Sequence, residues 1–308
     1  MPANAGIHDF SLPRLESPLE FENVFFNAFN GLIQGSFYAL MAIGLSLILG
    51  LNGVINFAHG GFMALAAYFA YTLFPYTGFW GALIIAPILA GAVGYAVEQL
   101  IVKRLYGRDP LYSLLATFGL ALIFQDMLRT IWGAQGLPLS IPDILNQPLS
   151  DTYFFVTGYR LFVVVLAILS TGGLFAILRY TRLGVRIRAG NADLETIAAM
   201  GVNIYLLRSA NFVLGIMFAG LAGILAAGQI GLTPTMGDSL IMPAFVAIVV
   251  GGVGSLLGSL LGGLIIGVAS GITTAFYPAA SEVVIYVIMG VMLVVRPRGL
   301  FGQEGLLE

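Results

Sequence analysis

The chain has 308 residues, of which 59% are hydrophobic and 9% are charged, and its formal net charge is −2. Soluble domains are about 45–50% apolar and about a quarter charged, so this composition excludes a water-soluble globule. Cysteine is absent from the sequence, which excludes disulfides and thiolate chemistry, and the low charge with a single lysine argues against binding to nucleic acid.

The apolar segments are continuous, as in membrane helices, and do not alternate with polar residues as in a β-barrel. They predict an all-α polytopic membrane protein with eight to nine transmembrane helices, at about 20 apolar residues per crossing. In chain order the segments are 25–50, 57–75, 79–102, 111–132, 159–180, 208–230, 241–254, 256–276 and 282–296. The segment 241–254 is either a short span or a re-entrant element, and this choice sets the count at nine or eight.

The remaining residues divide the chain into a transmembrane domain at 25–302 and two tails. We expect residues 1–24 to form either an amphipathic helix on the membrane surface or a disordered tail, and residues 303–308 to form a C-terminal tail. Within the transmembrane domain, the long polar stretch 181–207 connects two spans.

The basic residues orient these spans. They gather at 103–108, 179–188, 208 and 296–298. The positive-inside rule places those segments in the cytoplasm. With nine crossings, the N-terminus then lies outside and the C-terminus inside.

Several polar residues inside the spans are candidates for a translocation path. Asn30 and Gln34 are four residues apart on the first span and share one helix face with Tyr38, one turn further along. They either line a path for a small solute or hydrogen-bond to neighbouring helices, as Asn and Gln commonly do in membranes. Gln229, near the outer end of its span, is a further candidate for contact with a solute.

The polar break between the first two spans contains Asn56 and His59, followed by Gly60 and Gly61. Such interruptions expose helix ends in transporters. A gate, a packing role and substrate contact all remain open for Asn56 and His59. Glu98, near the cytoplasmic end of the third span, is expected at the membrane interface.

The stretch 181–207 contains a predicted helix of two to three turns. Asn191 is the expected N-cap, Asp193 and Glu195 suit the positive end of a helix dipole, and Gly201 is a natural stop. Ala198 and Ala199 are small and allow a partner to approach closely. The two interpretations are a docking element and an ordinary helix on the membrane surface.

Four separated blocks, in the same order, resemble the permease subunits of branched-chain amino acid ABC importers of the LivH type. They are ALMAIGLSLILGLNGVINFAHGGFMALAAY at 39–68, TRLGVRIRAGNADLETIAAMGVN at 181–203, FVAIVVGGVGSLLGSLLGGLIIG at 245–267 and RPRGLFG at 296–302. Glu195 to Gly201 looks like a variant of the Glu-Ala-Ala-x-x-x-Gly loop of ABC importer permeases, with its alanines shifted to Ala198 and Ala199.

The resemblance implies a permease of the bacterial inner membrane that works by alternating access. Its implied partners are two ATP-binding cassette ATPases, a second related permease, a periplasmic solute-binding protein and the lipid bilayer. This chain is expected to bind no cofactor, because it has no G-x-x-x-x-G-K-[ST] phosphate loop, and ATP and Mg²⁺ would bind to the ATPases. Alternatives are a related permease for urea, short amides or aromatic acids, and an ion-driven secondary transporter, which usually needs a charged residue deep in the membrane.

Overall fold

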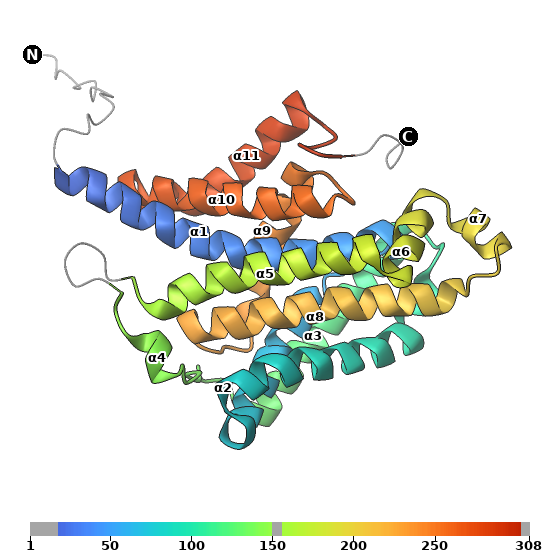
Figure 1. Ribbon diagram of the computed structural model, residues 1–308, viewed down its shortest axis with the longest axis horizontal. Coiled ribbons are helices and arrows are strands. Elements are labelled where there is room, and N and C mark those ends of the chain that lie inside the picture. The colour runs from blue at the N-terminus through green and yellow to red at the C-terminus, as the bar shows by residue number, and fades with distance from the viewer. Residues whose placement is uncertain (1–17, 150–155, 303–308) are drawn as a thin grey trace, which may run out of the picture.

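The computed structural model describes residues 18–149 and 156–302, and these form helices and loops without a β-strand (Figure 1). The α-helices are α1 (Pro18–Leu47), α2 (His59–Leu100), α3 (Pro110–Trp132), α4 (Asp143–Asn146), α5 (Gly158–Tyr180), α6 (Arg182–Ala192), α7 (Leu194–Ala199), α8 (Ile204–Ile230), α9 (Met236–Gly251), α10 (Leu256–Phe276) and α11 (Ser281–Val295). Three short helices of other types are η1 (Ile48–Asn52), η2 (Val102–Leu105) and η3 (Pro278–Ala280).

The predicted all-α membrane fold is confirmed. Within the described residues, seven helices are long and apolar enough to cross a membrane, and α9 is a shorter apolar helix. One of the seven, α2, has 42 residues and is broken at Gly78, where φ is +64°. The predicted spans 57–75 and 79–102 are the two limbs of α2, so counting them separately and adding α9 recovers the nine predicted segments.

Residues 18–24 of the predicted tail are helical, because α1 begins at Pro18 and continues into the first span. The rest of that predicted tail, residues 1–17, and the predicted C-terminal tail at 303–308 lie outside the described residues.

Helix α1 is the central helix of the bundle, because 83% of its 18-residue apolar stretch is buried inside the protein. Small residues let α10 approach it along its whole length: a Cβ added to Gly31 would come within 2.4 Å of the Gly267 carbonyl oxygen, and one added to Gly263 within 2.5 Å of the Ala39 nitrogen. On another side, Gly44 of α1 packs in the same way against Gly215 of α8. At these points the backbone of α1 is in direct contact with the backbones of α10 and α8, as is common where small residues line membrane helices.

The chain between α8 and α10 crosses the bundle. Helix α8 ends at the end of the bundle opposite to α6 and α7, whereas α10 begins beside the last turns of α1, on the same side as α6 (Figure 1). The segment 231–255 therefore traverses the bundle and does not return to its starting side. Helix α9 is short because residues 231–235 cover part of this distance without helical structure.

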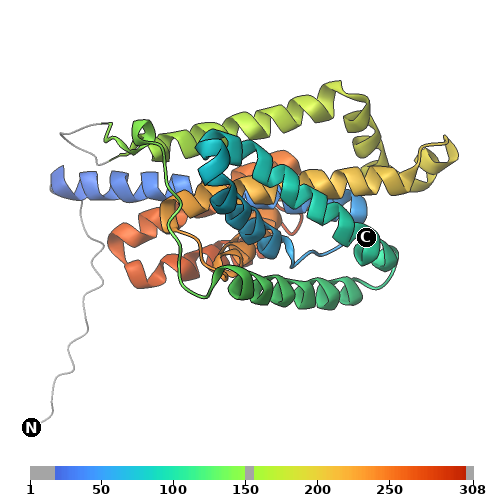
Figure 2. The ribbon, with the colours of Figure 1, turned by 90° about the horizontal axis from the view of Figure 1, so that it is seen from below.

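The basic segments gather at one end of the molecule. The link between α2 and α3 lies at the same end as α6 and α7 (Figure 2). The residues after α11 lie there too, because Leu300 and Phe301 donate backbone hydrogen bonds to Val250 and Gly251 at the end of α9. We call this the inner end and the opposite one the outer end, following the positive-inside rule.

Candidate functional sites at the outer and inner ends

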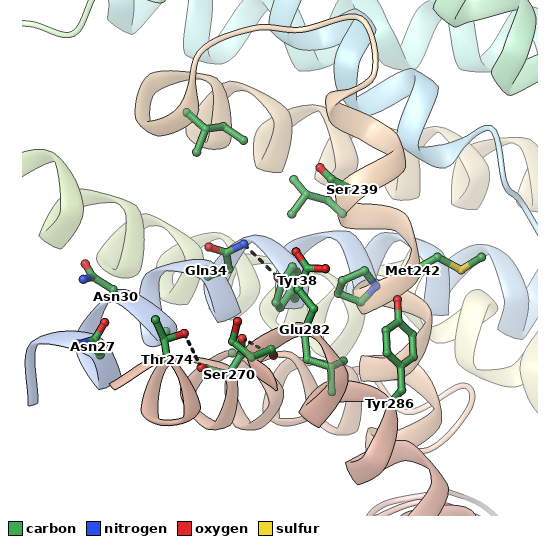
Figure 3. A pocket seen from close by; sticks show the side chains of 18 of the residues that line it. Asn27, Asn30, Gln34, Tyr38, Ser239, Met242, Ser270, Thr274, Glu282 and Tyr286 are labelled. Atoms are coloured by element: carbon green, nitrogen blue, oxygen red, sulfur yellow. Dashed lines mark hydrogen bonds between the residues drawn. The ribbon is translucent and has the colours of Figure 1, made fainter. Parts of the chain in front are cut away.

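A cavity of about 620 Å³ lies among α1, α9, α10 and α11 (Figure 3). Asn30, Gln34 and Tyr38 all line it, so the prediction that these three residues share one face is confirmed. They lie around the middle of α1, and the lining also includes Ile230, Asp238 and Glu282 at the outer ends of α8, α9 and α11, which places the cavity toward the outer end of the bundle. We call it the outer cavity.

The α1 wall of the outer cavity is held by side-chain hydrogen bonds. The Gln34 amide donates to the Tyr38 hydroxyl at 3.0 Å, and Tyr38 is only 5% exposed. The Arg160 guanidinium on α5 donates to Asn30 Oδ1 at 3.0 Å. Both polar groups of α1 are therefore fixed in position before a solute enters.

Two carboxylates, Glu282 and Asp238, also line the outer cavity, together with the hydroxyls of Ser270 and Thr274. Glu282 lies in the first turn of α11 and Asp238 in the first turn of α9, where acidic residues are favoured by the helix dipole. Asp238 accepts a hydrogen bond of 3.0 Å from the Gln125 amide of α3.

The sequence interpretation missed these four lining residues. In the sequence, Asp238 and Glu282 lie at the ends of their spans away from the basic segments, which is a signal for the outer side. Their meeting with α1 depends on the packing of α9, α10 and α11 around it, which has no local sequence signal.

Three predicted path residues lie elsewhere. Asn56 and His59 are 1% and 0% exposed and do not line the outer cavity. His59 packs against Gly44 of α1, since a Cβ on Gly44 would lie 2.9 Å from its Nε2. Gln229 is half-buried and lies next to the lining residue Ile230 without lining the cavity itself. A gate role for Asn56 and His59 stays a prediction.

The break before α2 is held by α3. The Thr117 hydroxyl accepts a hydrogen bond of 3.0 Å from the Phe57 backbone nitrogen and lies 3.0 Å from the Ile55 carbonyl oxygen. Gly60 in the first turn of α2 touches Gly237 of α9, where an added Cβ would meet backbone atoms at 2.7 Å. A non-helical backbone inside a membrane is tolerated only when other protein groups satisfy it, as they do here.

At the inner end, the predicted helix is present but begins later than expected. Helix α7 has six residues and its N-cap is Asp193, whose side chain accepts hydrogen bonds from the Glu195 and Thr196 backbone nitrogens, each at 3.0 Å. Asn191 as N-cap is therefore wrong: it lies in the last turn of α6. Hydrogen bonds from the hydroxyl and backbone of Thr196 lower the pKa of Asp193. The predicted stop is confirmed, because Gly201 follows the helix with φ at +82°.

Helix α7 exposes its small side chains. Ile197 is buried and fixes the helix to the bundle, whereas Glu195, Ala198 and Ala199 are exposed. Large apolar side chains flank them: Met200 is 77% exposed and Leu206 is 66% exposed. We call α7 and these two flanking residues the inner docking surface. An apolar surface on a segment too polar to enter the membrane is typical of a protein interface.

Glu98 lies in the last turn of α2, at the inner end, and it is completely buried within the protein. Its carboxylate accepts hydrogen bonds from the Tyr106 hydroxyl, the Gln99 amide and the Ser209 hydroxyl, each at 2.7 Å. Burial and the neighbouring Glu98 raise the pKa of Tyr106.

The same network reaches the end of α1. Asn52, in η1, donates to the Tyr106 hydroxyl at 2.7 Å, and Asn211 of α8 donates to Asn52 Oδ1 at 2.9 Å and to the Leu47 carbonyl oxygen at 2.6 Å. It therefore joins the inner ends of α1, α2 and α8 beside the inner docking surface.

Comparison with known proteins adds to this geometry. The sequence profile of a family described as "Branched-chain amino acid transport system / permease component" matches residues 27–295. That range includes the outer cavity, the inner docking surface and the Glu98 network.

Named relatives align over most of the chain. It is 30% identical to the high-affinity branched-chain amino acid transport system permease protein LivH of Salmonella typhimurium, covering 89% of this chain and 94% of the relative. The permease protein BraD of Pseudomonas aeruginosa has the same identity and the same coverage. The permease protein LivM of Escherichia coli is 29% identical and covers 71% of this chain and 57% of the relative. All three are named as transport permeases and not as enzymes.

Proposed function

The chain belongs to the family of branched-chain amino acid transport permeases, and on this basis we propose that it is a membrane permease subunit of an ABC importer. In this proposal it moves branched-chain or related amino acids into the cytoplasm by alternating access. The observation that carries the proposal is the pairing, on one bundle, of a polar outer cavity with an exposed inner docking surface at the opposite end.

The lining of the outer cavity favours a substrate with an amino group. Glu282 and Asp238 provide negative charge for an ammonium group, and the amides and hydroxyls of Asn27, Gln34 and Thr274 suit the remaining polar atoms. Ile230, Leu240 and Ile285 supply apolar lining for an aliphatic side chain. Urea, short amides and aromatic acids without an ammonium group have no positive charge to match the two carboxylates.

The inner docking surface supports partnership with ATPase subunits. It presents small residues, an acidic first turn and flanking apolar side chains outside the membrane, which suits a groove on a second protein. Two ATPases would bind ATP and Mg²⁺ and drive the switch between outward- and inward-facing states, while this chain binds no cofactor. The similarity to both LivH and LivM supports a second, related permease beside this one. The bacterial relatives support the inner membrane as the location and a periplasmic binding protein as the partner that delivers the substrate.

The proposal is tested by reconstitution. The tagged chain is co-expressed with its chromosomal neighbours, purified as a complex and placed in lipid, and ATP hydrolysis is measured with binding proteins loaded with Leu, Ile, Val or urea. We expect ATPase subunits to co-purify and the binding protein loaded with an amino acid to stimulate hydrolysis.

Other outcomes would change the proposal in defined ways. Stimulation by urea alone would keep the ABC mechanism and replace the substrate. Uptake driven by an ion gradient, without any associated ATPase, would contradict the proposal and favour a secondary transporter.

A further inference from the structure

A second cavity, of about 870 Å³, opens at the inner end, on a different face from the outer cavity. Its walls come from the last turns of α1 and α5, from α6 and from the start of α10. We call it the inner cavity. It is separate from the outer cavity, since no residue that the structure describes lines both.

The rim of the inner cavity is basic. Arg179 at the end of α5 and Arg188 on α6 both line it, and no acidic residue is among the described residues of the lining. The Arg188 guanidinium donates to the Leu178 carbonyl oxygen, which holds it beside the cavity and leaves its other N–H groups available. The positive rim therefore has one fixed guanidinium and one at the end of a membrane helix.

The start of α10 adds backbone donors to this rim. Ser255 is its N-cap and accepts from the Gly258 nitrogen at 3.0 Å, and Ser255, Leu256 and Leu257 line the cavity. The first amides of a helix have no partner within the helix, and the dipole of this 21-residue helix favours an anion at that end.

A buried hydroxyl in the wall is an independent indication of a ligand. Ser46 of α1 is 2% exposed and lines the inner cavity, and its Oγ makes no hydrogen bond within the described part of the chain. Serines in membrane helices usually donate to a carbonyl one turn back, as Ser36 does to Leu32 at 2.9 Å. An unpartnered buried hydroxyl costs free energy unless a ligand or water completes it.

Toward the membrane interior the lining becomes apolar. Gly172 lies seven residues before Arg179 on α5, which places it about 10 Å deeper along the helix axis. Phe175, Ala176 and Leu257 complete this part of the wall. A Cβ added to Gly172 would meet no atom within 4 Å, so open space adjoins the helix there.

We propose that the inner cavity is a binding site for an anionic phospholipid of the cytoplasmic leaflet. Its phosphate would lie between Arg179, Arg188 and the start of α10, and an acyl chain would extend along α5 past Gly172. A lipid fits better than a peptide segment because the cavity changes from basic to apolar along the membrane normal, at the depth where a headgroup meets its chains. Basic pockets between membrane helices on this side bind such headgroups.

The test uses the intact complex in detergent and native mass spectrometry with added phosphatidylglycerol, phosphatidylcholine or inorganic phosphate. Replacing Arg179→Gln and Arg188→Gln together is expected to weaken phosphatidylglycerol binding about 30-fold, since each basic residue near a headgroup contributes about fivefold. Arg186→Gln is the matched control, because Arg186 is an exposed arginine of α6 that does not line the cavity. The control and the weak binding of phosphatidylcholine should not change.

A second variant tests the site without altering its charge. Gly172→Phe should fill the open space beside α5 and displace the lipid while the rest of the fold is kept. The proposal is overturned if Arg186→Gln causes an equal loss, or if inorganic phosphate competes as strongly as the lipid, which would indicate a site for a free anion. It is also overturned if the arginine variants release the ATPase while lipid binding stays at the wild-type level. These results are independent of whether the cargo is an amino acid.

Discussion

At the scale of single residues, Glu282 separates the possible substrates of the outer cavity. Its carboxylate shares the lining with Gln34 and Tyr38 of α1, and it lies on α11, the last spanning helix (Figure 3). The amides and hydroxyls of the same lining suit any small polar solute. The negative charge suits only a solute that carries an ammonium group.

We therefore expect Glu282→Gln to weaken amino acid transport by about tenfold to a hundredfold, because the loss of a hydrogen bond to a charged group costs about 1.5–3 kcal/mol. Uptake of labelled leucine by proteoliposomes containing the whole complex measures this effect. Asp143→Asn is the control, because it removes an exposed acidic residue that does not line the cavity. Wild-type uptake by Glu282→Gln would place the substrate elsewhere.

At the scale of elements, the inner docking surface depends on how α7 is capped. The six-residue helix is too short to be stable alone, so its cap and the buried Ile197 determine whether it keeps its shape. Asp193 accepts from two backbone nitrogens at the start, and Gly201 has a positive φ that a side chain rarely adopts. These positions are therefore structural supports of the surface that is proposed to meet the ATPase.

Two neighbouring residues provide a matched test of this capping. Asp193→Ala is expected to destabilise α7 and to lower substrate-stimulated ATP hydrolysis, because it removes the side chain that accepts from the first backbone nitrogens of the helix. Asn191→Ala should have a smaller effect, because Asn191 lies in α6 and does not cap α7. Amide hydrogen exchange across 194–201 reports the local change, and a larger effect at Asn191 than at Asp193 would contradict the observed cap.

The Glu98 network also acts at the scale of elements, because its hydrogen bonds join the inner ends of α1, α2 and α8. Glu98→Ala removes a fully buried carboxylate that accepts three hydrogen bonds, so we expect a loss of about 3 kcal/mol in stability. Ser209→Ala removes one donor and should cost about 1 kcal/mol. Thermal unfolding of the purified complex measures both. Equal stability of Glu98→Ala and the wild type would show that the carboxylate is not held as described.

At the scale of the whole molecule, the sequence predicted most of the spans because each is a long, locally encoded apolar segment. The sequence did not predict features that depend on contacts between residues far apart in the chain. The burial of Glu98 in a hydrogen-bond network was not predicted, because its partner Ser209 is 111 positions away in the sequence. Asn191 was expected as the cap because both Asn and Asp suit that role, and only the end of α6 at Ala192 decides between them. The cavity lining joins helices from both ends of the chain and has no local pattern.

The orientation of the bundle is testable because the chain contains no cysteine. Asp143→Cys lies in the loop at the outer end and Arg108→Cys in the link at the inner end, and both native residues are exposed. In intact cells, a membrane-impermeant maleimide should label the first variant only, and permeabilisation should expose the second. The reverse pattern would invert the topology and reassign the inner docking surface to the outside.

The central position of α1 has a consequence for how the protein is made. This helix is the first described span to be synthesised, yet its packing partners α8 and α10 follow more than 150 residues later. Until they arrive, the faces of α1 around Gly31 and Gly44, which later meet α10 and α8, are exposed to lipid or to other helices. Membrane insertion and final packing of α1 are therefore separate events in time, and chains truncated after α5 should insert but remain targets for membrane proteases.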